Sequence, residues 1–317
     1  MASIVAAVAT VWDDIRLMVE VSNPDKLIFE KAGFTKADLV DHYERVGEAM
    51  LVFLSGRPLT LQRFPNGVES KGFMQKNASD HFPDSIGRFE VPKNDGGTTT
   101  YPVVELADDI AYLANQGTVT FHMWTATTER PSNPDWMVVD LDPSEGDLDG
   151  VRRTVHEVRR VLADFGIDGF PLVTGSSGFH VWIRLDGVHD DGEVAIASRA
   201  LSGLVATAIP ETATLEFLKK ERKGRVFVDW LRNTPGSTVV VPLSLRPRAN
   251  APVAVPITWD EVDGAVPDGW TIDALGDRLD IPVDPPPTSL PVEDIVAAAR
   301  AAGVDLDSTF DRFGRKR

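Results

Sequence analysis

A short apolar run that ends in two acids, Trp136-Met-Val-Val-Asp-Leu-Asp142, is the stretch from which the fold class is predicted. Its length and its apolar residues are typical of a buried strand. Alternate side chains of a strand project to the same side, so Asp140 and Asp142 are expected to share one face. Two carboxylates there repel each other unless a divalent cation lies between them, and oxygen ligands suit Mg²⁺ or Mn²⁺. The run therefore predicts a metal site at a strand end, with a solvated strand end as the alternative.

The Asp-Leu-Asp triplet itself is not specific, because it also occurs at 147–149 and 305–307. Only the triplet at 140–142 ends an apolar strand. We interpret Asp147 and Asp149 as favourable charges at the N-terminus of the helix that follows them.

A third acid, Asp229, lies inside the apolar run Arg225-Val-Phe-Val-Asp-Trp-Leu231. A carboxylate in a strand is costly unless it is paired or binds a metal. Asp229 is therefore expected either to complete a two-metal site with the first two acids or to form an ion pair with Arg225 or Arg232.

The order of elements around the first run predicts an α+β fold with mixed or antiparallel sheets and flanking helices. Strands are recognised by a period of two and helices by apolar residues along one face. After the run we expect a helix over 151–165, strands at 171–174 and 179–185, a helix over 194–208, and strands at 226–231, 239–245 and 253–257. This order differs from the regular alternation of a doubly wound parallel fold.

The first half and the tail have fewer signals. Thr35 followed by Asp38 is a capping-box variant and predicts a helix of about four turns. We also expect a Gly- and Pro-rich loop over 55–72, a helix over 105–115, a strand over 119–124 and a helix over 292–302. Prolines at 131 and 134 suggest a boundary, so the predicted modules are 1–130, 131–260 and an acidic extension at 261–317, together one unit.

The composition of the chain excludes several classes of site and function. The chain has 317 residues, no cysteine and a formal net charge of −16. Disulfides and thiolate metal sites are excluded, and the acidity is unfavourable for nucleic-acid binding through the overall field. Residues 219–248 nevertheless hold eight basic and two acidic side chains. No apolar run reaches the roughly 18 residues that span a bilayer, and Met1–Thr10 lacks the features of a secretory signal, so we expect a cytoplasmic protein without a membrane partner.

Candidate phosphate-binding groups lie in the second half. A tight turn is expected at Gly175-Ser-Ser-Gly178, between two strands. Backbone N–H groups in such a turn can face an anion, although the same residues also form ordinary hairpins. His180 follows on the less apolar face of its strand, and Arg246 and Arg248 close an apolar run.

Several motifs, in unbroken order, resemble one known family. They are Asn23-Pro-Asp-Lys26, Thr35-Lys-Ala-Asp38, Arg63-Phe-Pro-Asn-Gly67, Phe73-Met-Gln-Lys-Asn77, His122-Met-Trp124, Arg130-Pro131, Asp140-Leu-Asp-Pro-Ser-Glu-Gly146, Thr174-Gly-Ser-Ser-Gly-Phe-His-Val181, Phe227-Val-Asp-Trp-Leu-Arg-Asn233 and Pro242-Leu-Ser-Leu-Arg-Pro-Arg248. From about residue 20 to about residue 260 the chain resembles the polymerase domain of bacterial ligase D, a member of the archaeo-eukaryotic primase superfamily.

The resemblance implies a primase-polymerase fold with an RRM-like catalytic core. It also implies template-directed nucleotidyl transfer to a 3′-OH, in which ribo- or deoxyribonucleoside triphosphates fill short gaps or ends and two Mn²⁺ or Mg²⁺ ions are cofactors. It assigns the metals to Asp140, Asp142 and Asp229, and the nucleotide to His122, Thr174, Ser176, His180, Arg246 and Arg248. It assigns DNA to Asn23, Lys26, Lys36, Arg63, Phe73 and Lys76.

The first three DNA residues, Asn23, Lys26 and Lys36, match the family's pocket for a downstream 5′-phosphate. Because Lys36 opens a predicted helix, the free N–H groups of that helix are also expected to contact the anion. The substrate implied is therefore gapped or end DNA with a 5′-phosphate.

The chain departs from the family pattern in two respects. The family turn usually reads Ser-Gly-Gly/Ser-Lys-Gly. Here Thr174 replaces the Ser and Ser177 replaces the Lys, so one cationic contact to the triphosphate is missing. No Lys-x-Asp-Gly ligase signature occurs. We therefore expect a stand-alone polymerase or primase-polymerase relative, associated with the bacterial nucleoid, with an end-binding protein and a separate ligase as possible partners.

Two alternatives were weighed against this function. A haloacid-dehalogenase-like phosphatase also places Asp-x-Asp after an apolar strand, but it requires Thr or Val where Ser144 stands. A catalytically silent DNA-end binder would retain the 5′-phosphate residues without needing all three acids.

Overall fold

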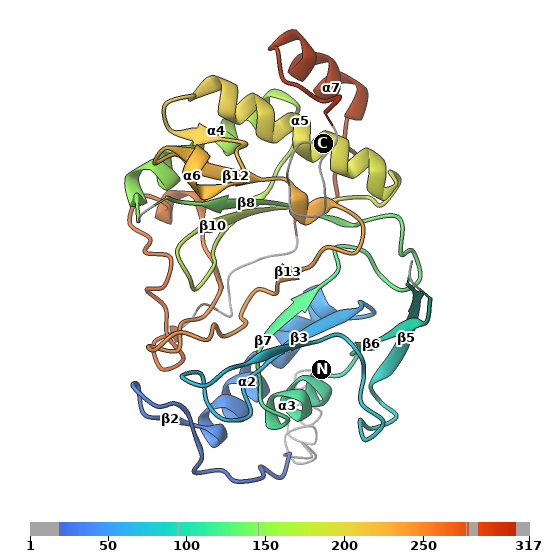
Figure 1. Cartoon of the computed structure of the whole chain (residues 1–317), viewed down its shortest axis with the longest axis vertical. Coiled ribbons are helices and arrows are strands. Elements are labelled where there is room, and N and C mark those ends of the chain that lie inside the picture. The colour runs from blue at the N-terminus through green and yellow to red at the C-terminus, as the bar shows by residue number, and fades with distance from the viewer. Residues whose placement is uncertain (1–18, 94–95, 145, 277, 279–284, 309–317) are drawn as a thin grey trace, which may run out of the picture.

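The computed structural model describes residues 19–93, 96–144, 146–276, 278 and 285–308. Glu145 of the quoted motif and the segment Met1–Thr10 lie outside these ranges. Two sheets form the centre of the molecule, and the longer helices lie on their outer sides (Figure 1). The predicted α+β class with mixed and antiparallel sheets is confirmed.

The larger sheet has six strands in the order β11-β12-β8-β10-β9-β14. Their bounds are β8 Trp136–Asp142, β9 Phe170–Val173, β10 Phe179–Arg184, β11 Ala213–Thr214, β12 Val226–Asp229 and β14 Val255–Pro256. Neighbouring strands are antiparallel except for the parallel pair β11 and β12. Helices α4 (Leu148–Asp164) and α5 (Asp191–Ala208) cover the outer face of this sheet (Figure 1). Asp147 and Asp149 lie at the N-terminus of α4, as predicted, and Asp147 also caps the helix by accepting a hydrogen bond from Gly150 N.

The smaller sheet has four strands in the order β13-β7-β3-β4. Their bounds are β3 Leu59–Arg63, β4 Phe73–Gln75, β7 Thr118–Met123 and β13 Val239–Val240. Helices α2 (Lys36–Leu54) and α3 (Ala107–Asn115) pack against each other on its outer side. The remaining elements are β1 Leu27–Phe29, β2 Phe34–Thr35, β5 Gly87–Pro92, β6 Thr98–Val103, α6 Lys219–Arg222, η1 Leu231–Asn233, η2 Trp259–Glu261 and α7 Val292–Ala301. Because β13 lies late in the chain, both halves of the sequence contribute to this sheet.

The capping box at Thr35 is confirmed, since its side chain accepts from Asp38 N and the Asp38 carboxylate accepts from Thr35 N. Two other predictions are wrong. The loop expected over 55–72 contains β3, which pairs with both β4 and β7. The strand expected over 239–245 ends at Val240, because Pro242 has no N–H for a ladder and Leu243 adopts a left-handed φ of +67°.

Aromatic packing joins the two halves of the molecule. Phe53, near the end of α2, lies 5.5 Å from the ring of Trp136 and 5.6 Å from that of Trp182, both on the larger sheet. All three side chains are fully buried. Trp182 shares its face of β10 with His180, the face expected to be less apolar, and is nevertheless fully buried in this aromatic cluster. Among the described residues, no helix is long and apolar enough to cross a bilayer.

Candidate active site

The three predicted acids meet at the centre of the larger sheet. Asp140 on β8 lies directly opposite Asp229 on β12, and Asp142 follows two residues later on the same face. One carboxylate oxygen from each acid lies within 4.8 Å of the other two. Asp140 and Asp229 are only 6% and 4% exposed. Strand pairing thus places three carboxylates where water can solvate them poorly.

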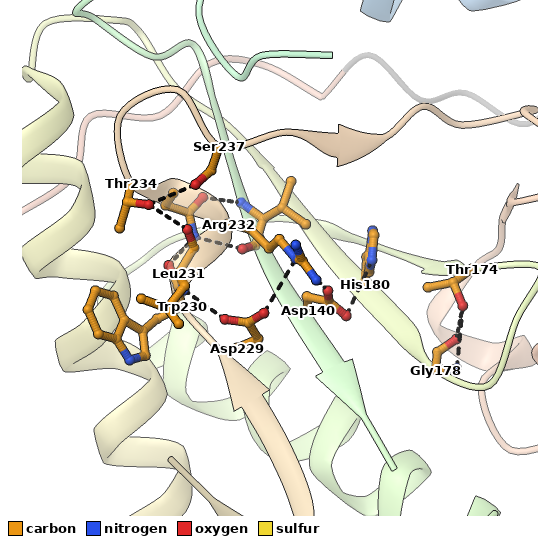
Figure 2. A network of polar contacts seen from close by, with 12 residues as sticks. Asp140, Thr174, Gly178, His180, Asp229, Trp230, Leu231, Arg232, Thr234 and Ser237 are labelled. Carbon is orange, nitrogen blue, oxygen red and sulfur yellow. Dashed lines mark hydrogen bonds and ion pairs between the residues drawn. The ribbon is translucent and has the colours of Figure 1, made fainter. Parts of the chain in front are cut away.

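Arg232 lies between two of these acids, as Figure 2 shows. Its Nε donates to Asp140 Oδ2 at 2.9 Å and lies 3.4 Å from Asp229 Oδ2. On the other side, His180 Nε2 lies 3.4 Å from Asp140 Oδ1, because β10 pairs His180 with Asp140. The expected ion pair between Asp229 and Arg232 is therefore present. Arg225, the other candidate, donates instead to nearby backbone carbonyls.

The negative charge of the three carboxylates is not fully neutralised by the cations around them. Burial alone would raise the pKa of Asp140, but His180 and Arg232 hold it well below its ordinary value. Burial and the charge of Asp140 raise the pKa of Asp142, and the same causes raise the pKa of Asp229 to about 6. A divalent cation would relieve this repulsion, and an all-carboxylate set suits Mg²⁺ or Mn²⁺. The residues present therefore fit the metal site that the sequence predicts.

Asn233 holds this arrangement together and was not predicted from the sequence. Its Oδ1 accepts from Val138 N and its Nδ2 donates to Val138 O, both at 2.8 Å, so the amide pairs with β8 as a neighbouring strand would. Its Nδ2 also donates to Ser198 Oγ of α5 at 2.7 Å. Because Asn233 follows Arg232 directly, these bonds fix the short helix η1 that presents the guanidinium. Its sequence signals were its place at the end of the family motif Phe227–Asn233 and its position immediately after an arginine beyond the strand.

A cavity of about 280 Å³ opens beside the acids, between the two sheets. Its lining includes the predicted residues Asp140, Asp142, His122, Thr174, Ser176, His180 and Arg246, together with Met74, Gly178, Ser177, Arg232, Thr238, Val239 and Val240. Thr174 closes the β9–β10 turn, since its N–H and hydroxyl both donate to Gly178 O. The N–H groups of Gly175, Ser176 and Ser177 have no acceptor among the described residues, which agrees with the predicted anion-binding turn.

The two predicted arginines both contact this turn. Arg246 Nη1 donates to Thr174 O at 2.8 Å, and Arg248 Nη2 donates to Ser176 Oγ. Burial lowers the pKa of Arg246, which stays a cation at physiological pH. Arg248 is exposed and does not line the cavity. Across the cavity, desolvation and then the charge of Arg246 lower the pKa of His122 to about 3, so its imidazole is neutral.

The residues predicted to contact DNA from the smaller sheet lie on or just after β3 and β4, and one neighbour of theirs, Met74, lines the cavity. Phe73 on β4 is 48% exposed, and its neighbour Met74 lines the cavity. Arg63 does not reach outward, because its guanidinium donates to Gln75 and to the carbonyl of residue 116 and lies 5.6 Å from the Phe73 ring centroid. Arg63 therefore supports Phe73 from within the fold. The third residue, Lys76, is exposed.

The residues predicted to bind a 5′-phosphate lie together at the start of α2. Lys36 Nζ donates to Ser22 O at 2.7 Å, Lys26 Nζ lies 3.3 Å from Asn66 Oδ1, and Asn23 adopts a left-handed φ of +52°. Burial and then the charge of Lys26 lower the pKa of Lys36, so the two ammonium groups are near neighbours.

The expectation that N–H groups of this helix contact the anion is wrong. The N–H of Lys36 donates to Lys26 O, that of Ala37 donates to Pro24 O, and that of Asp38 donates to Thr35 Oγ1. The first turn is therefore satisfied by the protein itself. Any phosphate bound here must depend on the side chains.

A family model described as the LigD primase-polymerase domain matches residues 35–303. The chain belongs to this family. It is 32% identical over 265 residues to the multifunctional non-homologous end joining protein LigD of Mycolicibacterium smegmatis, covering 83% of this chain and 35% of that protein. It is also 32% identical over 269 residues to the bifunctional LigD protein of Bacillus subtilis, covering 82% of this chain and 42% of that protein.

A solved structure agrees with the LigD family match. The polymerase domain from Mycobacterium tuberculosis ligase D, in complex with DNA, is similar with a TM-score of 0.73 and 31% identity, covering 90% of this chain and 95% of that one. The chain thus spans about the whole of that domain but only 35% to 42% of the two LigD relatives named. The match leaves the haloacid-dehalogenase-like alternative without support.

Proposed function

We propose that this chain is a template-directed nucleotidyltransferase of DNA repair, which adds ribo- or deoxyribonucleotides to a 3′-OH at short gaps or ends. The observation on which this rests is a cluster of three carboxylates, two of them buried, beside a cavity that is also lined by Arg246, by His180 and by a turn whose backbone N–H groups have no acceptor among the described residues. An acidic end suits cations and a basic end suits a triphosphate. A catalytically silent DNA-end binder would not need this expensive cluster of acids.

Each part of the cavity has a chemical task in this proposal. Arg246 and the turn of β9 and β10 bind the triphosphate, Arg248 adds a cation at the rim, and the neutral His122 offers a hydrogen bond from the smaller sheet. Asp140, Asp142 and Asp229 would hold two Mn²⁺ or Mg²⁺ ions, which stabilise the attacking and leaving oxygens of an in-line displacement. Arg232 keeps the acids in place by partly neutralising Asp140 and Asp229.

The DNA would lie across the smaller sheet. Phe73 offers an exposed aromatic face for stacking on a template base or on the nucleotide, and Lys76 a cation for the backbone. Asn23, Lys26 and Lys36 would bind the 5′-phosphate of the downstream strand. We assign DNA binding to the module 1–130 and catalysis to 131–260, with an end-binding protein and a ligase as partners at the bacterial nucleoid.

Primer extension on a one-nucleotide gapped duplex tests the proposal. Asp140→Asn and Asp142→Asn should reduce nucleotide addition to background with Mn²⁺ or Mg²⁺, because each removes a ligand charge. The matched control is Asp149→Asn, which alters another Asp-Leu-Asp triplet at a side chain that is 85% exposed. That variant should extend at the wild-type rate.

Circular dichroism should find all three variants folded, since the changes are isosteric. Extension by Asp140→Asn within a few-fold of wild type would contradict the assignment of the acids. Parallel reactions with ribo- and deoxyribonucleotides, on gapped, nicked and unprimed templates, would identify the substrate.

A further inference from the structure

A buried network links helix α2 to the segment just before Arg246. Tyr43 of α2 is completely buried, and its hydroxyl donates to Val119 O at 2.6 Å and accepts from Leu245 N at 3.0 Å. Thr120 of β7 is also buried, and its hydroxyl donates to Leu245 O at 2.7 Å. Both polar groups of the Leu245 backbone are therefore held by side chains from the smaller sheet and its helix.

Leu245 lies in a segment that does not form a regular strand. The strand expected over 239–245 stops at Val240, and Leu243 has a left-handed φ of +67°. His42, next to Tyr43, contacts the carbonyl of Leu243 at 2.9 Å through Nε2. The residues on either side of Leu245 bond to the backbone of 252–254, whereas the N–H and carbonyl of Leu245 itself bond to the side-chain hydroxyls of Tyr43 and Thr120.

The carbonyl that Thr120 contacts belongs to the peptide group that continues into Arg246. The N–H of that group donates to Pro252 O at 2.8 Å, and the guanidinium reaches Thr174 O at 2.8 Å inside the cavity. The direction of the Arg246 side chain therefore depends on how the Leu245 backbone is held. A shift of that backbone would move the guanidinium relative to the turn that it contacts.

We propose that Tyr43 and Thr120 are positioning residues for nucleotide binding, which act by fixing the Leu245 backbone so that Arg246 points into the cavity. The inference rests on the proposed function, in which Arg246 binds the triphosphate. Neither hydroxyl lines the cavity, so neither touches the nucleotide.

Tyr43→Phe and Thr120→Val, made in the full chain, remove one hydroxyl each at nearly constant volume. The nucleotide Kd, measured by titrating fluorescent mant-ATP with Mn²⁺, should rise about five- to tenfold in each, because a buried backbone group loses its partner and the segment can shift. The KM for the nucleotide should rise in step, while kcat at saturating nucleotide and the Kd for gapped duplex stay within about twofold. The control is Tyr112→Phe, whose hydroxyl contacts His81 O on the exposed side and should change nothing.

A double-mutant cycle separates positioning from general destabilisation. If Tyr43 acts through Arg246, Tyr43→Phe should add little to the Kd of Arg246→Ala, because the guanidinium to be positioned is already absent. Independent, additive losses would overturn the inference. The inference would also be overturned if Tyr43→Phe and Thr120→Val kept the wild-type nucleotide Kd while Arg246→Ala bound the nucleotide more weakly. A wild-type Kd in Arg246→Ala would instead overturn the proposed triphosphate site.

Discussion

Replacing Asp229 by Asn should stabilise the metal-free protein while abolishing its activity. The raised pKa of about 6, against an ordinary 3.8, means that ionising this carboxyl costs about 3 kcal/mol more in the folded chain than in the unfolded chain. The cost already includes the favourable charge of Arg232. Asn keeps an acceptor for Leu231 N, which now bonds Asp229 Oδ1 at 2.9 Å. We therefore expect a gain of about 1–3 kcal/mol in unfolding free energy at pH 8.

The sign of the pH dependence follows from the raised pKa. At a pH well below 3.8 the carboxyl is protonated in both the folded and the unfolded wild type, so the wild type should be about as stable as the Asn variant. As the pH rises from about 3.8 to about 6, the unfolded chain ionises Asp229 while the folded chain keeps its proton, so the difference in stability opens over this range and is nearly complete above pH 6. The wild type therefore becomes less stable than the Asn variant as the pH rises.

Urea denaturation in EDTA, followed by tryptophan fluorescence at pH 4.5 and pH 8, measures this difference. Added Mn²⁺ should raise the stability of the wild type more than that of Asp229→Asn, because only the wild type keeps all three acids. Asp149→Asn serves as the exposed control and should show neither effect. A variant less stable than the wild type at pH 8 without metal would refute the reasoning, since Asp229 would then be chiefly an ion-pair partner of Arg232.

Three further predictions concern the substrates. Arg246→Ala should raise the nucleotide KM about tenfold and the exposed Arg248→Ala less, because each removes a charge-assisted contact; an unchanged KM in both would contradict their assignment. Ser177→Lys should tighten mant-ATP binding by placing a cation at the cavity edge, and weaker or unaltered binding would mean that the turn does not approach the phosphates. Lys26→Ala combined with Lys36→Ala should erase any preference for a 5′-phosphate over a 5′-OH on matched gapped duplexes, while extension on an open template stays nearly unchanged; equal affinities of the wild type for both duplexes would rule out the pocket.

Local periodicity predicted the part of the site that strands determine. Asp140 and Asp142 were placed on one face by the period of two, and the pairing of β8 with β10 and β12 then brings His180 and Asp229 beside them. Sequence patterns could not indicate which strands would be neighbours without the family resemblance. The presence of Arg232 between two acids depends on Asn233 and on that pairing, so it was expected only as one of two ion pairs.

Local sequence patterns gave wrong predictions where contacts between distant residues determine the backbone conformation. β3 was not predicted, because it is a strand of five residues between turn formers in a Gly- and Pro-rich stretch and has little periodicity. The break after Val240 has a local signal in Pro242, but the hydroxyl of Tyr43 that holds the backbone beyond it belongs to a residue 202 positions away and could not be predicted. The capping box at Thr35 was predicted, but the acceptors of the Lys36 and Ala37 N–H groups were not, because Lys26 and Pro24 lie in an irregular segment before the helix.

The direct pairing of Asp140 with Asp229 has a consequence for how the molecule tolerates insertions and deletions. Carboxylate spacing is set by backbone hydrogen bonds inside the sheet, and the surrounding loops do not enter into it. One residue inserted within β12 would turn the third acid to the opposite face, toward α4 and α5, and dismantle the site without unfolding the sheet. The same insertion beside Gly96 or Gly97, which are exposed before β6, would leave the distance between the acids unchanged.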